Sequence, residues 1–295
     1  MGKDLVAEFP ASRHVFEEAD DALGFALSEL CFQGPSERLQ LTENTQPAIL
    51  ATSIAALRAL EEAGFPSAAF VAGHSLGEYT ALVAAGSLSL RDALTIVKAR
   101  GRYMQEAVPL GVGAMAAIIG ADLDTVVRAC GEAAKGQVCS PANINSPNQI
   151  VIAGHTEAID RAVILLKALG AKRAIKLKVS APFHCSLMQP AQRRLATDLA
   201  TIAFRDLEVP VVTNVDARAV TAGDEARDAL ERQVSQTVRW LESVEFLIAH
   251  GVQSFIEIGP GKVLSGLVRQ IHGSVSCVNV QDVASLRAAH EARGA

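Results

Sequence analysis

A serine between two glycines is the segment of this chain best suited to chemistry. Gly73-His74-Ser75-Leu76-Gly77 follows the short apolar segment 70–72 and precedes a stretch with small residues, 78–83. This order predicts a strand, a sharp turn and a helix, with the serine hydroxyl raised above a sheet and the free N–H groups of the helix directed at a nearby oxyanion. A serine placed in this way can attack a carbonyl carbon. The alternative is a glycine-rich turn without chemistry.

A serine nucleophile needs a base, and His184 is the histidine that we select for this role. It follows a predicted strand in the loop Ser180-Ala181-Pro182-Phe183-His184, whose proline could direct an imidazole rigidly across a domain junction. By contrast, His250 lies in a predicted helix and His290 in the C-terminal tail. The alternative for His184 is a surface histidine with no catalytic role.

Arg100 breaks the pattern of the predicted helix 91–107. It stands between Val97 and Met104 at helical spacing, so its stem shares the apolar stripe that faces inward. A guanidinium cannot lose its charge, and in that position it needs an anion. The anion is either a substrate group or an intramolecular partner, unless the side chain extends to solvent instead.

The composition is typical of a globular protein with a large core, since 49% of the 295 residues are hydrophobic. Aromatic residues make up only 4%, which favours α/β layers over an aromatic-rich β-sandwich or a single-strand binder. The net charge of −5 attracts neither phosphate backbones nor anionic membranes. We therefore expect no nucleic-acid partner and no membrane partner.

The cysteines and the N-terminus predict a cytoplasmic location. The chain has five cysteines, an odd number with no C-x-x-C pair, which argues against a disulfide framework and against a zinc site. Charges occupy the first residues where a signal peptide needs an apolar stretch, and no apolar run reaches the ~18 residues of a membrane span. We expect reduced thiols, no bound metal and neither export nor membrane insertion.

The order of predicted elements indicates an α/β fold with an inserted domain. Residues 1–69 are predicted to be helical, with a helix over 47–62 that has Pro47 at its start and Thr45 as its cap, and strands follow at 68–72, 209–214 and 255–258. Between them, a βαββαβ unit is predicted from strand 114–119, helix 123–134, strand 138–144, strand 149–153, helix 157–169 and strand 173–179. We therefore predict a parallel-sheet large domain over 1–111 and 180–295, interrupted by a ferredoxin-like small domain over 112–179.

Several motifs together resemble one enzyme family. In chain order they are Gly73-His74-Ser75-Leu76-Gly77-Glu78, Arg100-Gly101-Arg102-Tyr103-Met104-Gln105, Asn145-Ser146-Pro147, Ser180-Ala181-Pro182-Phe183-His184 and Gly259-Pro260-Gly261. The chain closely resembles malonyl-CoA:acyl carrier protein transacylases over practically its whole length. That family has a hydrolase-like α/β domain interrupted by a ferredoxin-like domain, in agreement with the element order above.

The resemblance implies a reaction and a role for each of the three residues. Ser75 would be the acylated nucleophile, His184 its base, and Arg100 the residue that binds the free carboxylate of the malonyl group. The enzyme would transfer malonyl from malonyl-CoA to the phosphopantetheine thiol of acyl carrier protein by a ping-pong mechanism, for fatty acid or polyketide chain extension. The arginine favours malonyl over acetyl, and no metal or redox cofactor is implied.

The same resemblance implies three supporting residues and one departure from the family. The backbone carbonyl at Gln233 would orient the histidine, Gln46 would lie near the acyl pocket, and the Leu76 N–H would donate to the oxyanion. Family members usually begin with an apolar strand that runs into Phe-Pro-Gly-Gln-Gly-Ser-Gln, whose first glutamine gives the second oxyanion N–H. This chain lacks that segment, so we expect the second donor to be missing and the chain as given to be impaired.

Two other functions remain open from the sequence. An α/β-hydrolase esterase or thioesterase would share the serine turn and transfer the acyl group to water, with its histidine near the C-terminus. A catalytically impaired homologue would bind the carrier protein without acylation, through the basic face of Lys172, Lys176 and Lys178 on the predicted strand 173–179.

Overall fold

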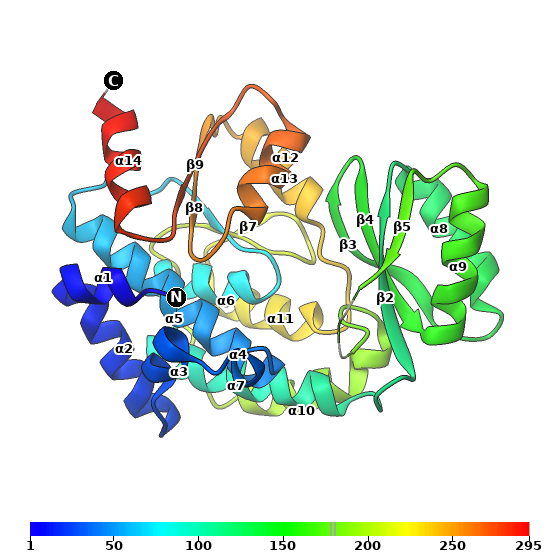
Figure 1. The fold of residues 1–295 in the computed structure, drawn as a ribbon, viewed down its shortest axis with the longest axis horizontal. Coiled ribbons are helices and arrows are strands. Elements are labelled where there is room, and N and C mark those ends of the chain that lie inside the picture. The colour runs from blue at the N-terminus through cyan, green and yellow to red at the C-terminus, as the bar shows by residue number, and fades with distance from the viewer. Residues whose placement is uncertain (178, 180, 295) are drawn as a thin grey trace.

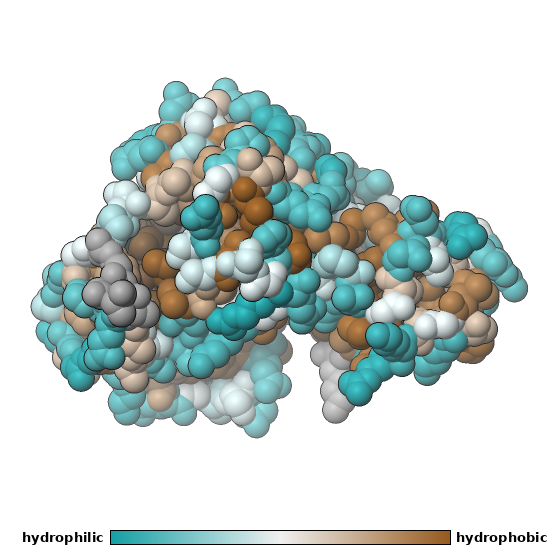
Figure 2. All heavy atoms as spheres, turned by 90° about the horizontal axis from the view of Figure 1, so that it is seen from above, coloured by the Kyte–Doolittle hydropathy of each residue, from teal (hydrophilic) through white to brown (hydrophobic). Residues whose placement is uncertain are grey.

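Two lobes of unequal size make up the computed structural model, which describes residues 1–177, 179 and 181–294 (Figure 1). The large lobe contains both ends of the chain, and the small lobe is formed by the middle segment, coloured green. Seen from above, the surface is hollowed between the two lobes (Figure 2).

Helices form the whole N-terminal part of the large lobe, as the sequence predicted. They are α1 (Lys3–Glu8), α2 (Pro10–Leu23), α3 (Leu27–Gln33), α4 (Ser36–Leu39) and α5 (Thr42–Glu62). None of the helices in the described part of the chain has the length and apolar character that crossing a membrane requires.

Helix α5 begins earlier than predicted. It starts at Thr42, so Pro47 lies inside the helix and not at its first position. Thr45 does not cap the helix either, because its hydroxyl donates to the carbonyl oxygens of Leu39 and Leu41 at 2.5 and 3.1 Å. The carbonyl of Leu41 accepts from the N–H groups of Asn44 and Thr45, which starts the helix before the proline.

The remaining elements of the large lobe come before and after the small lobe in the chain. They are β1 (Val71–Ala72), α6 (Leu76–Ala84), α7 (Leu90–Glu106), the 3-10 helix η1 (Ser186–Met188), α10 (Gln189–Leu199), β6 (Val211–Val212), β7 (Ala219–Val220), α11 (Gly223–Gln233), α12 (Trp240–Ala249), β8 (Ser254–Ile258), α13 (Val263–Ile271), β9 (Ser276–Val280) and α14 (Val283–Gly294). The main apolar core packs residues of α2, α5, α6, α7 and α10 together.

The strands of the large lobe do not form the one parallel sheet that the sequence predicted. Among the described residues, β1 pairs in parallel with β6, which pairs antiparallel with β7, while β8 and β9 form a separate parallel pair. Strand β8 has only β9 as a partner among the described residues, and its Ile256 is 42% exposed.

The small lobe follows the predicted βαββαβ order. Its elements are β2 (Gly113–Ile119), α8 (Leu123–Ala134), β3 (Cys139–Ser146), β4 (Gln149–His155), α9 (Thr156–Ala168) and β5 (Arg173–Lys176). The strands form an antiparallel sheet in the order β3-β4-β2-β5, and both helices pack against it through one apolar cluster. The predicted residues Lys178 and Ser180 lie outside the described residues.

Strand β3 attaches the small lobe to the large one. The N–H of Ile144 donates to the carbonyl of Val238 at 2.9 Å, and the N–H of Val238 donates to that of Ala142 at 2.9 Å. Beside this bridge, His74 Nε2 lies 2.9 Å from Asn145 Oδ1, so the serine turn itself contacts the small lobe. These contacts fix the small lobe beside Ser75.

The turn between β1 and α6 requires glycine at position 73. A Cβ on Gly73 would lie 2.0 Å from the backbone C and O atoms of Gly77, far inside contact distance. At Gly77 an added Cβ meets nothing within 4 Å. The close backbone approach in this turn therefore requires glycine at position 73 but not at position 77.

We expect Gly73→Ala to destabilise the protein, since the clash can be relieved only by moving the backbone. Overpacking of this kind costs about 1–3 kcal/mol, and thermal unfolding monitored by circular dichroism measures it. Gly77→Ala is the matched control, with a change below about 1 kcal/mol, because alanine suits a helix better than glycine does. Equal melting temperatures for the two variants would contradict this account of the turn.

Candidate active site

Ser75 lies in the sharp turn that connects β1 to α6. Ser75 has φ 52° and ψ −107°, a strained conformation for a residue with a side chain. Leu76 is the first residue of α6, so its N–H is one of those with no acceptor inside the helix. A helix N-terminus therefore lies beside the serine and favours negative charge there.

Ser75 and His184 are in hydrogen-bond contact across the lobe. Ser75 Oγ lies 2.7 Å from His184 Nε2, and His184 Nδ1 lies 2.9 Å from the backbone oxygen of Gln233. A carbonyl oxygen only accepts, so Nδ1 carries the proton and the lone pair of Nε2 faces the serine hydroxyl. This tautomer is the one that can take the serine proton.

Burial keeps the imidazole of His184 neutral. Desolvation first, and then the nearby charge of Arg100, lower the pKa of His184 to about 3, against the opposing effect of the Gln233 carbonyl. The imidazole is therefore unprotonated and able to accept a proton throughout the neutral range.

Arg100 lies beneath the serine and is only 2% exposed. Its Nη1 donates to Gln46 Oε1 at 2.7 Å, and its Nη2 donates to Ser75 Oγ at 3.0 Å and to Gln233 Oε1 at 2.9 Å. No ion pair of the described residues includes Arg100. All three of these hydrogen-bond partners are neutral, and a buried cation without a direct ion pair is costly, so the site is suited to an anion.

A glycine brings this arginine within reach of α5. A Cβ on Gly101 would lie 2.6 Å from the backbone oxygen of Thr42 and 2.8 Å from Glu43 Cα. Helix α7 thus approaches the first turn of α5 more closely than a side chain would permit. That approach places the guanidinium of Arg100 against Gln46, one turn further along α5.

Comparison with known proteins agrees with this geometry. The family model described as "Acyl transferase domain" matches residues 1–291. The malonyl CoA-acyl carrier protein transacylase of Escherichia coli strain K12 is 50% identical over 291 residues, which cover 99% of this chain and 94% of the relative. That of Bacillus subtilis strain 168 is 47% identical over 283 residues, which cover 96% and 89%. The chain belongs to the malonyl-CoA:acyl carrier protein transacylase family.

Solved structures of transacylases superpose closely on this one. A malonyl-transacylase in complex with its type II PKS acyl-carrier protein has a TM-score of 0.96 at 49% identity, over 99% of this chain and 94% of that one. An acyl carrier protein S-malonyltransferase from Vibrio cholerae has a TM-score of 0.96 at 48% identity, over 98% and 94%. The mixed α/β architecture with a small antiparallel lobe is thus the acyltransferase fold.

Asn214 is a residue of this transacylase site that the sequence analysis missed. Its Oδ1 accepts from the Ser75 N–H at 2.6 Å, and its Nδ2 donates to the Gly73 carbonyl at 2.7 Å. Both bonds lie on the N-terminal side of the strained Ser75 Cα and hold the turn in place. The sequence offered one signal for Asn214, namely that this residue ends the predicted strand 209–214. Because β6 pairs in parallel with β1, the end of that strand lies beside the serine turn.

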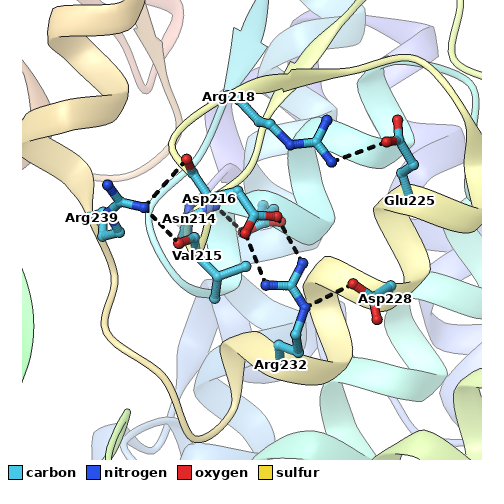
Figure 3. A network of polar contacts seen from close by, with 9 residues as sticks. Asn214, Val215, Asp216, Arg218, Glu225, Asp228, Arg232 and Arg239 are labelled. Atoms are coloured by element: carbon cyan, nitrogen blue, oxygen red, sulfur yellow. Dashed lines mark hydrogen bonds and ion pairs between the residues drawn. The ribbon is translucent and has the colours of Figure 1, made fainter.

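The loop that carries Asn214 is held in place by arginines (Figure 3). Arg232 donates to both carboxylate oxygens of Asp216 at 2.9 and 2.7 Å, and to Asp228 at 2.7 Å. Arg239 donates to the carbonyl oxygens of Val215 and Asp216 at 3.3 and 3.4 Å. The side chain of Arg232 lowers the pKa of Asp216, so this carboxylate stays charged and the loop stays fixed.

The residues on which the two alternative functions depended lie elsewhere or are already paired. His290, the histidine of the esterase alternative, is exposed and packs against Phe65 with 5.8 Å between ring centroids, whereas His184 contacts Ser75. Lys176 of the basic face pairs with Asp160 at 2.7 Å. These contacts weaken both alternatives.

We expect His184 to remain neutral down to about pH 4. Its side-chain resonances in a two-dimensional ¹H–¹⁵N NMR experiment should keep the neutral pattern with the proton on Nδ1 from pH 8 to pH 5, because burial lowers its pKa to about 3. The spectrum of His184→Gln assigns the signal by its loss. A titration midpoint between pH 6 and 7 would show that the imidazole is not desolvated.

Proposed function

We propose that this chain transfers malonyl from malonyl-CoA to the phosphopantetheine thiol of acyl carrier protein, with Ser75 as the nucleophile and His184 as its base. The observation that carries the proposal is the 2.7 Å contact between Ser75 Oγ and His184 Nε2 beside a buried guanidinium. Membership of the transacylase family supports the reaction, and the geometry supports the role of each residue.

Arg100 selects the malonyl group in this proposal. Its Nη2 touches Ser75 Oγ at 3.0 Å, so an acyl group on that oxygen lies beside the guanidinium. Malonyl has a free carboxylate that can replace the neutral partners of the arginine, and acetyl has none. The fork of the guanidinium fits a carboxylate with two parallel hydrogen bonds.

The first half-reaction acylates the serine. His184 Nε2 takes the proton of Ser75 Oγ, and Oγ attacks the thioester carbonyl of malonyl-CoA. The oxyanion forms beside the N-terminus of α6, where the Leu76 N–H can donate to it. The carbon–sulfur bond then breaks, and CoA leaves as a thiol with the proton from His184.

The second half-reaction reverses these steps with a different thiol. The phosphopantetheine thiol of the carrier protein gives its proton to His184 Nε2 and attacks the ester carbonyl on Ser75. The carbon–oxygen bond breaks, Oγ regains the proton, and malonyl leaves on the carrier protein. The kinetics are ping-pong with one covalent intermediate, and the product serves fatty acid or polyketide chain extension.

We also propose the domain division and the location that the sequence predicted. A small domain over 112–179 with the strand order β3-β4-β2-β5 supports a ferredoxin-like insertion into the large domain formed by 1–111 and 180–295. All five cysteines are free, which is compatible with the reducing cytoplasm.

Intact mass after brief incubation with malonyl-CoA tests the covalent step. We expect a malonyl adduct on the wild-type chain and none on Ser75→Ala, because the ester forms on Oγ. Addition of phosphopantetheinylated carrier protein should remove the adduct and leave malonyl on the carrier thiol. If the folded chain binds carrier protein but forms no adduct, the impaired-homologue alternative replaces this proposal.

A second prediction concerns Arg100. We expect Arg100→Ala to slow acylation by malonyl-CoA about 100-fold, the loss of roughly 3 kcal/mol from a charge-assisted contact. Acylation by acetyl-CoA should change little, and it shows within the same experiment that the variant folds and that Ser75 still reacts. An equal loss with both substrates would assign Arg100 to the serine and not to the malonyl carboxylate.

A further inference from the structure

A buried glutamate lies under the serine turn, and the mechanism above does not use it. Glu78 is in the first turn of α6 and is 0% exposed. Its Oε2 accepts from the Asn214 N–H at 3.0 Å and from Gln233 Nε2 at 2.8 Å. Its Oε1 has no partner among the described residues. A buried carboxyl group is costly, so its retention here needs an explanation.

The two residues that Glu78 holds contact every reacting group of the site. Gln233 donates from Nε2 to the Ser75 carbonyl at 2.9 Å and accepts from Arg100 Nη2 at 2.9 Å, and its backbone oxygen faces His184 Nδ1 at 2.9 Å. Asn214 binds the strained turn at two points, the Ser75 N–H and the Gly73 carbonyl. Through Asn214 and Gln233, one carboxylate oxygen of Glu78 is therefore linked to Ser75, His184 and Arg100.

The charges of Glu78 and Arg100 together fix which way the Gln233 amide points. The amide oxygen faces Arg100, and the amide nitrogen faces Glu78 Oε2. A flipped amide would direct its N–H groups at a guanidinium and its oxygen at a carboxylate, and both contacts would be repulsive. The negative and positive charges on the two sides of the amide thus exclude the flipped orientation.

We propose that Glu78 is a positioning residue, which through Gln233 and Asn214 sets the direction of Arg100 and His184 and the strained turn at Ser75. The proposal rests on the roles given to Ser75, His184 and Arg100 under Proposed function. Glu78 itself touches no substrate atom in this account. Its effect is on how well the reacting groups are aligned, and misalignment of about 1 Å can cost about 100-fold in rate.

Because Glu78 can change its protonation state, this role should appear in the pH dependence of the acylation rate. Burial raises the pKa of Glu78 to about 7, against the lowering effects of the Asn214 and Gln233 contacts and of Arg100. The charged or titratable groups around it are Arg100 on α7, Asp216 in the loop after β6 and the neighbouring Tyr79 on α6. As the pH falls below about 7, the carboxylate takes up a proton and loses its charge, which weakens its hold on the Gln233 amide.

The experiment measures single-turnover acylation by malonyl-CoA between pH 5.5 and 9, with intact mass as the readout. We expect the wild-type rate to rise with pH through an inflection near 7 that the base cannot cause, because the pKa of His184 is about 3. Glu78→Gln keeps an acceptor oxygen and removes the charge, so we expect no inflection and a rate roughly tenfold lower. Glu78→Ala also removes the acceptor, with a loss of about 100-fold.

Glu257→Gln is the matched control. Glu257 accepts from the N–H groups of Leu264 and Ser265 at 3.0 and 2.7 Å, so its carboxylate also holds two N–H groups, at the start of α13. We expect this variant to change the melting temperature and to keep the wild-type pH profile. A purely structural role of Glu78 would give the same result for both glutamates.

Three outcomes would overturn the proposal: a wild-type profile that is flat between pH 6 and 8, an unchanged inflection in Glu78→Gln, or a folded Glu78→Ala within twofold of the wild-type rate. The wild-type profile is informative even if a variant does not fold. Failure of the proposed function is distinguishable, because then the wild-type chain itself would form no adduct that Ser75→Ala abolishes.

Discussion

The burial of one permanently charged side chain constrains the rest of this site. Arg100 is 2% exposed and cannot release its proton, so the protein must surround it with acceptors. Those acceptors come from Gln46 on α5, Gln233 on α11 and Ser75 at the start of α6. Three segments far apart in the sequence are thus tied to one guanidinium, and the proposed nucleophile lies on one of the three.

A second constraint is the strained backbone at Ser75. A left-handed φ of 52° persists only where the surroundings hold it. Here Asn214 binds the turn at the Ser75 N–H and the Gly73 carbonyl, Gly73 permits the close backbone approach, and arginines hold the loop that carries Asn214 (Figure 3). The strain holds the half-buried hydroxyl at the start of α6, where an oxyanion can meet the helix N-terminus.

These two constraints together explain the chemistry. The hydroxyl faces an imidazole that burial keeps neutral, and a cation that has no ion-pair partner among the described residues lies beside the serine oxygen. In the proposed function, the thioester carbonyl of malonyl-CoA meets this hydroxyl and the malonyl carboxylate meets this cation. The small lobe also contacts this region, since Asn145 on β3 lies within hydrogen-bond distance of His74, next to the serine.

The sequence by itself determined the local parts of this protein. The glycines around Ser75 predicted the turn, the helical spacing of Arg100 placed its stem inward, and alternating strands and helices predicted the small lobe, because these patterns depend on near neighbours in the chain. The resemblance to transacylases added Gln46 and Gln233, which no local pattern would have selected.

Only the tertiary structure decided which groups meet. The contacts of Glu78 with Asn214 and Gln233 join residues more than a hundred positions apart. From the sequence alone, a carboxylate in the first turn of a helix is explained by its favourable interaction with the helix N-terminus, so these contacts could not be inferred. The pairing of strands was likewise open, because a hydrogen-bonded edge depends on which strand packs beside it, and so the expected single sheet is two sheets in the described residues. The sequence determined which helix, strand or turn each segment can form. Long-range packing decided how deeply the side chains of the site are buried, which of them stay charged and how they are aligned.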